Sequence, residues 1–129
     1  MTTATLTPTQ LEFIDRVNGF VNIIEKNGEN TNIESIIKSI RELEEDISKH
    51  IKESLMTDGE KKVFYKKIND SFDSLSTSTH IIFLTTYEKF RQYSLTMQTQ
   101  IMNLVEVIDE IWNQCAIMTY DFSTKNMAK

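Results

Sequence analysis

The longest uninterrupted stretch of this chain constrains its fold most. Residues 79–118, THIIFLTTYEKFRQYSLTMQTQIMNLVEVIDEIWNQCAIM, contain no glycine and no proline. Mostly apolar residues recur there at alternating steps of four and three, the heptad spacing of one helix face. The seam consists of Phe83, Tyr87, Phe90, Ser94, Met97, Ile101, Leu104, Ile108, Ile111, Cys115 and Met118. The pattern predicts one long C-terminal helix over about residues 79–120, with a length of about 60 Å.

The two halves of this predicted helix differ in the width of their apolar face. From residue 83 to 97 the apolar stripe is narrow, whereas from residue 101 onward Met102, Val105 and Trp112 broaden it. No Lys or Arg occurs between Gln92 and Thr124. A helix with so broad an apolar face must contact two or more neighbours.

Start and stop signals predict three helices ahead of this stretch. The tetrapeptides TPTQ at 7–10 and TDGE at 57–60 each place a threonine three residues before Gln or Glu, the pattern of a capping box. Asn32 is a further N-cap, and Gly28 ends the first helix. The helices are expected over residues 8–26, 33–55 and from about residue 58.

The end of the third helix is the least defined boundary. The sequence STST at residues 76–79 favours a break there, because Ser and Thr hydroxyls compete for backbone hydrogen bonds. Two alternatives stay open, namely one continuous helix or a break near residues 94–96.

These elements predict an all-α fold, a helical bundle of about four helices. Only three glycines and one proline are available for turns, which disfavours an all-β fold. We expect a single domain over residues 8–120, a flexible N-terminal tail at 1–7 and a frayed C-terminal tail at 121–129. Because the last helix is about twice as long as the others, either the short helices stack along it or part of its seam pairs with a second chain.

Candidate catalytic and metal-binding groups are few. The histidines are His50 and His80, and Asp46 and His50 share a helix face without any further histidine to complete a metal site. The single cysteine, Cys115, has apolar helical neighbours and no cation to lower its pKa, which favours a place in the core. No glycine-rich phosphate loop occurs. The sequence therefore predicts no enzyme, no cofactor and no metal.

A cluster of lysines lies in the third predicted helix. Lys61, Lys62, Lys66 and Lys67 are interleaved with Phe64 and Tyr65, and the cluster forms a possible basic patch for nucleic acid. The other interpretation is a solvated helix face that pairs with the acidic run at residues 42–46. A net charge of −5 favours the solvated face, so nucleic acid is not the expected partner.

Two polar residues interrupt the apolar stripes. Glu44 lies between Ile40 and Ile47, and Ser94 lies between Phe90 and Met97. A polar residue in such a seam can fix register or select a partner. We hypothesise that Glu44 marks an interface; the alternative is a side chain that reaches outward from the edge of the stripe.

The function expected from these features is a non-enzymatic protein–protein interaction module, a small acidic adaptor, inhibitor or regulator. We expect a protein partner, with a homodimer favoured, and a cytoplasmic location, since no signal peptide or membrane-spanning segment is visible. The predicted interface residues are Phe83, Tyr87, Phe90, Ser94, Met97, Ile101 and Glu44. One alternative is a carrier that binds a small apolar ligand among Phe72, Phe83, Tyr87, Phe90 and Trp112, and another is a nucleic-acid accessory protein that uses the basic patch.

Overall fold

The computed structural model describes the backbone of residues 6–127 and the side chains of residues 6–118. Within this range the chain is helical and contains no strand, so the predicted all-α helical bundle is confirmed. The elements are α1 (Pro8–Asn27), the 3-10 turn η1 (Gly28–Asn30), α2 (Ile33–Glu53), α3 (Asp58–Phe83), α4 (Tyr87–Gln92) and α5 (Leu95–Met127).

The first three helices begin where the sequence signals place them. The Thr7 hydroxyl accepts a hydrogen bond from the Gln10 amide, and the Gln10 side chain accepts one from the Thr7 amide. Thr57 and Glu60 form the same reciprocal pair at the start of α3. Asn32 caps α2, which ends two residues earlier than predicted. These side chains satisfy amides that the first helical turn leaves without partners.

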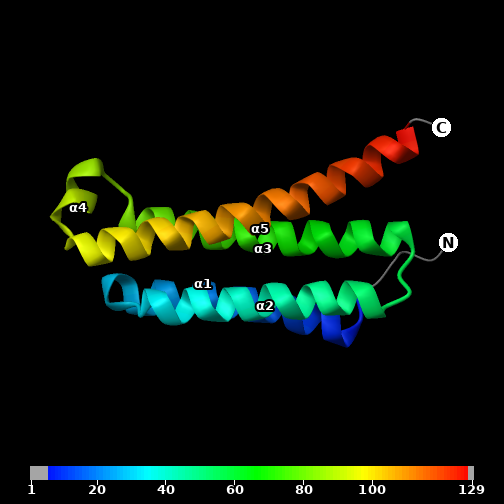
Figure 1. Ribbon diagram of the computed structural model, residues 1–129, viewed down its shortest axis with the longest axis horizontal. Helices are drawn as coiled ribbons and strands as arrows, with labels where there is room; N and C mark the ends of the chain where they lie inside the picture. The colour runs from blue at the N-terminus through cyan, green and yellow to red at the C-terminus, as the bar shows by residue number, and fades with distance from the viewer. Residues whose placement is uncertain (1–5, 128–129) are drawn as a thin grey trace.

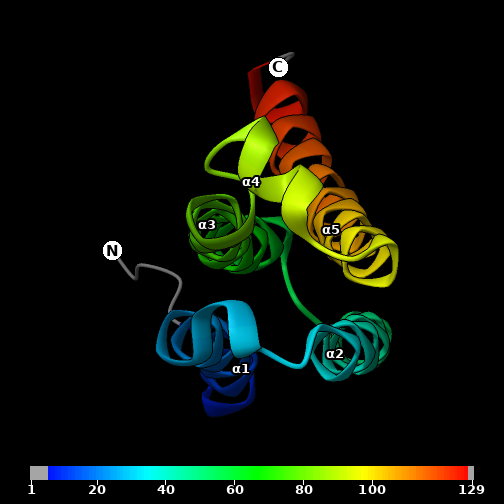
Figure 2. The ribbon, with the colours of Figure 1, turned by 90° about the vertical axis from the view of Figure 1, so that its left-hand side faces the viewer.

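Four long helices lie at the corners of the bundle (Figures 1 and 2). α3 packs against α1 and α5, and α5 also packs against α2. α1 and α2 form an antiparallel pair, and so do α3 and α5 (Figure 1). The link at residues 54–57 therefore crosses the bundle diagonally, and α2 and α3 occupy opposite corners although they follow one another in the chain (Figure 2).

All four long helices contribute to the core. α3 supplies its largest side chains, because a stripe at steps of three and four faces both α1 and α5. The largest fully buried side chains include Phe64, Phe72, Phe83, Ile24, Ile40, Leu43, Ile101, Leu104 and Ile108. Burial of this kind, rather than helix propensity, stabilises most helices in proteins.

The favoured break at residues 76–79 is wrong, because α3 continues through them to Phe83. The hydroxyls of Thr77 and Thr79 donate to the carbonyls of Asp73 and Leu75, four residues earlier, at 3.0 and 2.8 Å. These bonds leave the helical backbone intact. Thr79 itself is fully buried, so packing on the core face holds this segment in the helix.

The predicted long C-terminal helix is present as α5, but it begins at Leu95 rather than near residue 79, because the chain breaks at 84–86 and again at 93–94. The second position agrees with the alternative of a break near residues 94–96. Thr86 accepts from the Lys89 amide and Ser94 from the Met97 amide, each at 3.1 Å, so hydroxyl caps start α4 and α5 without glycine or proline. The two breaks let α5 fold back against α3.

The ends of the bundle also differ from the expected boundaries. α5 extends to Met127, beyond the predicted end near residue 120. At the other end, Leu6 packs against the core, although the sequence places it in a flexible tail. Residues 1–5 and 128–129 lie outside the described part of the chain.

Candidate functional site

A mainly apolar hollow of the described surface lies between α2 and α5. These helices are neighbours, and α5 leans away from α2 toward its C-terminal end (Figures 1 and 2). The separation leaves a groove of about 660 Å³, here called the α2–α5 groove. It is lined by Glu44, Glu45, Ile47, Ser48, Ile51, Lys52, Tyr65, Ile111, Gln114, Cys115, Ile117 and Met118.

The groove has a buried apolar floor and a partly exposed apolar edge. Ile111, Cys115 and Tyr65 are buried, and Ile47 and Ile51 of α2 are half-buried. On the α5 side, Ile117 is 58% exposed and Met118 is 38% exposed. Exposed apolar side chains that are continuous with a buried floor mark a binding surface more strongly than scattered ones do.

Cys115 lies on the groove floor in a form unsuited to nucleophilic chemistry. Burial, and after it the nearby negative charge of Glu44, raises the pKa of the Cys115 thiol to about 12. The thiol is therefore protonated at neutral pH, whereas the nucleophile would be the thiolate. The sequence interpretation of Cys115 as a buried apolar side chain is confirmed.

Glu44, which interrupts the apolar stripe of α2, lines this groove together with Glu45. The Glu44 side chain is half-exposed, so it is not a core residue of the bundle. Cys115 lines the same groove, and the negative charge of Glu44 contributes to the raised pKa of its thiol.

A second, more polar hollow of about 410 Å³ lies farther along the same two helices. It is lined by Glu34, Ile37, Arg41, Asn103 and Glu106. The Gln100 side chain donates to the Glu34 carboxylate at 3.0 Å and so joins α5 to α2 near this hollow. The surface between α2 and α5 is thus apolar near Ile51 and acidic and polar toward Glu34.

The other predicted interface residues are not brought together on one surface. Phe83 and Ile101 are fully buried in the core. Tyr87 is 73% exposed on α4, and Phe90 and Met97 are half-buried. Ser94 is the cap of α5. The seam that appears continuous in the sequence is divided by the two helix breaks.

The lysine cluster lies along the first half of α3. Lys66 and Lys67 are exposed, whereas Lys61 and Lys62 are half-buried. Lys66 pairs with Asp70 on its own helix at 3.6 Å. α2, which carries the acidic run, lies at the corner of the bundle diagonally opposite α3 (Figure 2).

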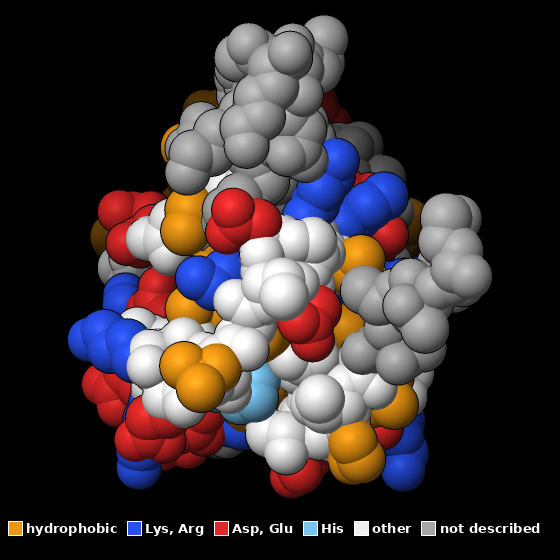
Figure 3. Space-filling view, turned by 90° about the vertical axis from the view of Figure 1, so that its right-hand side faces the viewer, with side chains coloured by type: hydrophobic (Ala, Val, Ile, Leu, Met, Phe, Trp, Pro, Cys, Tyr) orange, Lys and Arg blue, Asp and Glu red, His pale blue; other side chains and the backbone are white. Residues whose placement is uncertain are grey.

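His50 belongs to a packing cluster at the end of the bundle where α2 stops. Its ring lies edge-on to Phe13 and Phe64, with centroid distances of 5.5 and 5.9 Å, and its nitrogens contact the side chains of Gln10 and Ser54. Figure 3 shows this end, where hydrophobic side chains lie between charged ones.

Asp46 does not join His50 as a metal ligand. Its carboxylate accepts a hydrogen bond from the Arg16 guanidinium of α1 at 2.9 Å. Among the described residues, no three or more acidic, histidine or cysteine side chains are grouped to hold a metal ion.

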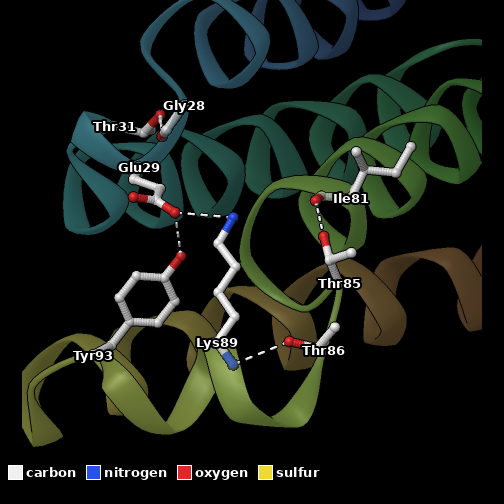
Figure 4. Close-up of polar contacts among 8 residues, drawn as sticks. All are labelled: Gly28, Glu29, Thr31, Ile81, Thr85, Thr86, Lys89 and Tyr93. Carbon is white, nitrogen blue, oxygen red and sulfur yellow. Dashed lines mark hydrogen bonds and ion pairs between the residues drawn. The ribbon is translucent and has the colours of Figure 1, made fainter.

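At the opposite end of the bundle, Glu29, Lys89 and Tyr93 form a polar cluster, here called the Glu29 clamp, which was not predicted from the sequence (Figure 4). One carboxylate oxygen of Glu29 in η1 accepts from the Tyr93 hydroxyl and from the Lys89 ammonium, each at 2.9 Å. The Lys89 ion pair and the Tyr93 hydrogen bond lower the pKa of Glu29. Burial and the contact with Glu29 raise the pKa of Tyr93 to about 12. No sequence pattern links these residues, because they lie about sixty positions apart.

The aromatic residues proposed for a carrier cavity are also dispersed. Phe72 and Phe83 are fully buried in the core, Trp112 is half-buried on α5, and Tyr87 is exposed on α4. Asn69 donates to the Trp112 carbonyl at 3.1 Å, which fixes α3 to α5 on that side. Neither of the two hollows between α2 and α5 is lined by these aromatic side chains.

In comparisons with other proteins, the chain matches no known protein family, no curated protein sequence and no solved structure. In the described part of the chain, none of the helices combines the length and the apolar composition that a membrane span needs.

Proposed function

We propose that this protein is a non-enzymatic interaction module that binds a helical segment of a partner protein in the α2–α5 groove. The observation that carries the proposal is the apolar floor of Ile111, Cys115 and Tyr65, which is continuous with exposed side chains at the groove edge. Two nearly parallel helices with an apolar hollow between them provide a site into which a third helix packs.

The dimensions of the groove suit this kind of ligand. Its α2 wall runs from residue 44 to residue 52, about 12 Å of helix axis. Such a length accommodates about three apolar anchors spaced i, i+3 or i+4 and i+7 on a bound helix. The groove is open along its length rather than enclosed, which favours an extended segment over a small molecule.

Site-specific photo-crosslinking tests the proposal. A photoreactive amino acid replaces Gln114 at the groove rim in one variant and Asp15 on the exposed face of α1 in another. In the native lysate, we expect a protein adduct from position 114 and not from position 15. The Ile117→Glu change should abolish the adduct, whereas Leu11→Glu, also at an exposed apolar residue, should not.

Equal crosslinking from both positions, or no protein adduct at position 114, would contradict the proposal. Circular dichroism of each variant checks that the helical content is unchanged. Ile117 and Leu11 are 58% and 48% exposed, so both changes should leave the core intact.

A further inference from the structure

The charges around the α2–α5 groove are unequal in sign. The two hollows between α2 and α5 are lined by four glutamates and two basic residues. The glutamates are Glu34, Glu44, Glu45 and Glu106, and the basic residues are Arg41 and Lys52. Both basic residues belong to α2, so the α5 side of this surface offers no positive charge.

Helix geometry extends the acidic side of the groove. On α5, Glu110 is four residues after Glu106 and four residues before Gln114, and these three positions therefore share one face. Over the described side chains of α5, residues 95–118, there is no Lys, Arg or His to offset these carboxylates. A helix that lies along both hollows meets the apolar floor of the α2–α5 groove, with Glu44, Glu45 and Lys52 on the α2 side and Glu106 of the second hollow on the α5 side.

From this charge distribution we infer that the occupant of the groove is a cationic amphipathic helix of another protein. Its apolar side chains would pack on Ile111, Ile117 and Met118, and its lysines or arginines would face Glu44 and Glu45 on one side and Glu106 and Glu110 on the other. The inference rests on the proposed function and adds the chemistry of the partner.

A second copy of this chain fits the groove less well. The chain carries a net charge of −5, and its own apolar α5 face has carboxylates at its edges. Seating α5 of one copy in the groove of another would place these carboxylates against Glu44 and Glu45. Like charges in contact oppose association, whereas opposite charges speed it and select the partner.

Binding of three model peptides to the full-length protein tests the inference. Each peptide has about 18 residues, or about 27 Å of helix, with leucine at positions i, i+3, i+4 and i+7. The remaining positions are lysine in the first peptide, glutamine in the second and glutamate in the third. Affinity is measured by fluorescence anisotropy of the labelled peptide, and the Lys peptide is expected to bind most tightly.

Charge-reversal variants localise this preference. Glu44→Lys/Glu45→Lys should weaken binding of the Lys peptide at least about tenfold and improve binding of the Glu peptide. Glu12→Lys/Asp15→Lys makes the same change in net charge on α1, away from the groove, and should have a much smaller effect. The milder pair Glu44→Gln/Glu45→Gln should fall in between and provides a second test if the reversal disturbs folding.

Apolar variants separate failure of the charge inference from failure of the proposed function. If the Lys and Gln peptides bind equally and Ile117→Ser weakens both while Leu11→Ser weakens neither, the groove binds helices but the inferred partner charge is wrong. If Ile117→Ser and Leu11→Ser have the same effect on every peptide, or no peptide binds, both the inference and the helix-binding function are overturned. If sedimentation shows a dimer that Ile117→Ser dissociates, the groove holds a second copy and the inference is overturned.

Discussion

Glu29 connects two loops at one end of the bundle. It lies in η1 between α1 and α2, and its two partners, Lys89 and Tyr93, belong to the connection between α3 and α5. The contact is on the surface, where an isolated ion pair contributes little. The contact instead fixes the relative position of two connections that are far apart in the sequence, the one between α1 and α2 and the one between α3 and α5.

The lowered pKa of Glu29 predicts a pH-dependent effect on stability. Because the folded pKa lies below the ordinary value, the ionised carboxylate stabilises the fold above the unfolded pKa, and this contribution is lost as pH falls through the folded pKa. Urea unfolding should therefore show the parent protein to be more stable than Glu29→Gln at pH 7, with the difference shrinking toward pH 3. Tyr93→Phe, which removes one of the two bonds to Glu29, should reduce the difference. A difference that is the same at both pH values would contradict the assignment.

Single polar residues in apolar stripes have more than one structural cause. Both Ser94 and Glu44 stand out as polar residues in apolar stripes. Ser94 interrupts its stripe because the helix itself begins there, and Glu44 because its stripe borders an open groove. The heptad pattern cannot distinguish these cases, since it registers only that a polar residue occupies an apolar position.

At the scale of the elements, the helix starts after Thr7, Asn32 and Thr57 were predicted, whereas those after Thr86 and Ser94 lay inside the predicted long helix. TPTQ and TDGE each combine a cap with a reciprocal partner three residues later, and both start a helix at the expected residue. Thr86 and Ser94 have no such partner, and the apolar spacing continues across them. The hydroxyls at 76–79 resemble caps in composition, yet they bond within α3, because burial of that face outweighs their local preference.

Proline substitutions distinguish the helix interior from a helix start. Thr77→Pro, at an exposed position inside α3, should destabilise the protein by about 3 kcal/mol or more, because it removes a helical hydrogen bond and clashes with the preceding turn. Tyr87→Pro, also at an exposed position, should cost far less, because residue 87 is the first of α4 and Thr86 before it is already extended, with φ −137° and ψ 153°. Thermal unfolding followed by circular dichroism measures both. Equal losses would indicate that the chain is helical through residue 87.

At the scale of the whole molecule, the arrangement of the helices was not predictable from their sequences. A short link at 54–57 permits α3 to lie beside α2 or diagonally across from it. The diagonal placement makes α5, not α3, the second neighbour of α2. This choice puts the lysine cluster and the acidic run on diagonally opposite helices, and it brings Glu44 and Cys115 to the same groove. The groove thus results from the way the helices are arranged. Its lining residues can be read from the sequence, but their proximity in space cannot.

The two ends of the bundle should also differ in local stability. The Glu29 clamp closes one end, and the first part of α5 packs on both α3 and α2, with Ile101, Leu104 and Ile108 buried. Beyond Ile111 the helix borders the groove and exposes Ile117.

Local opening costs less where fewer apolar contacts are lost, so amides at 112–118 should exchange with deuterium faster than those at 101–108. Native-state exchange measured by mass spectrometry or NMR tests this gradient along a single helix, which removes differences in secondary structure as a cause. Uniform protection over both segments would show that the groove end is as firmly packed as the clamped end, and it would weaken the case that α5 can receive a partner there.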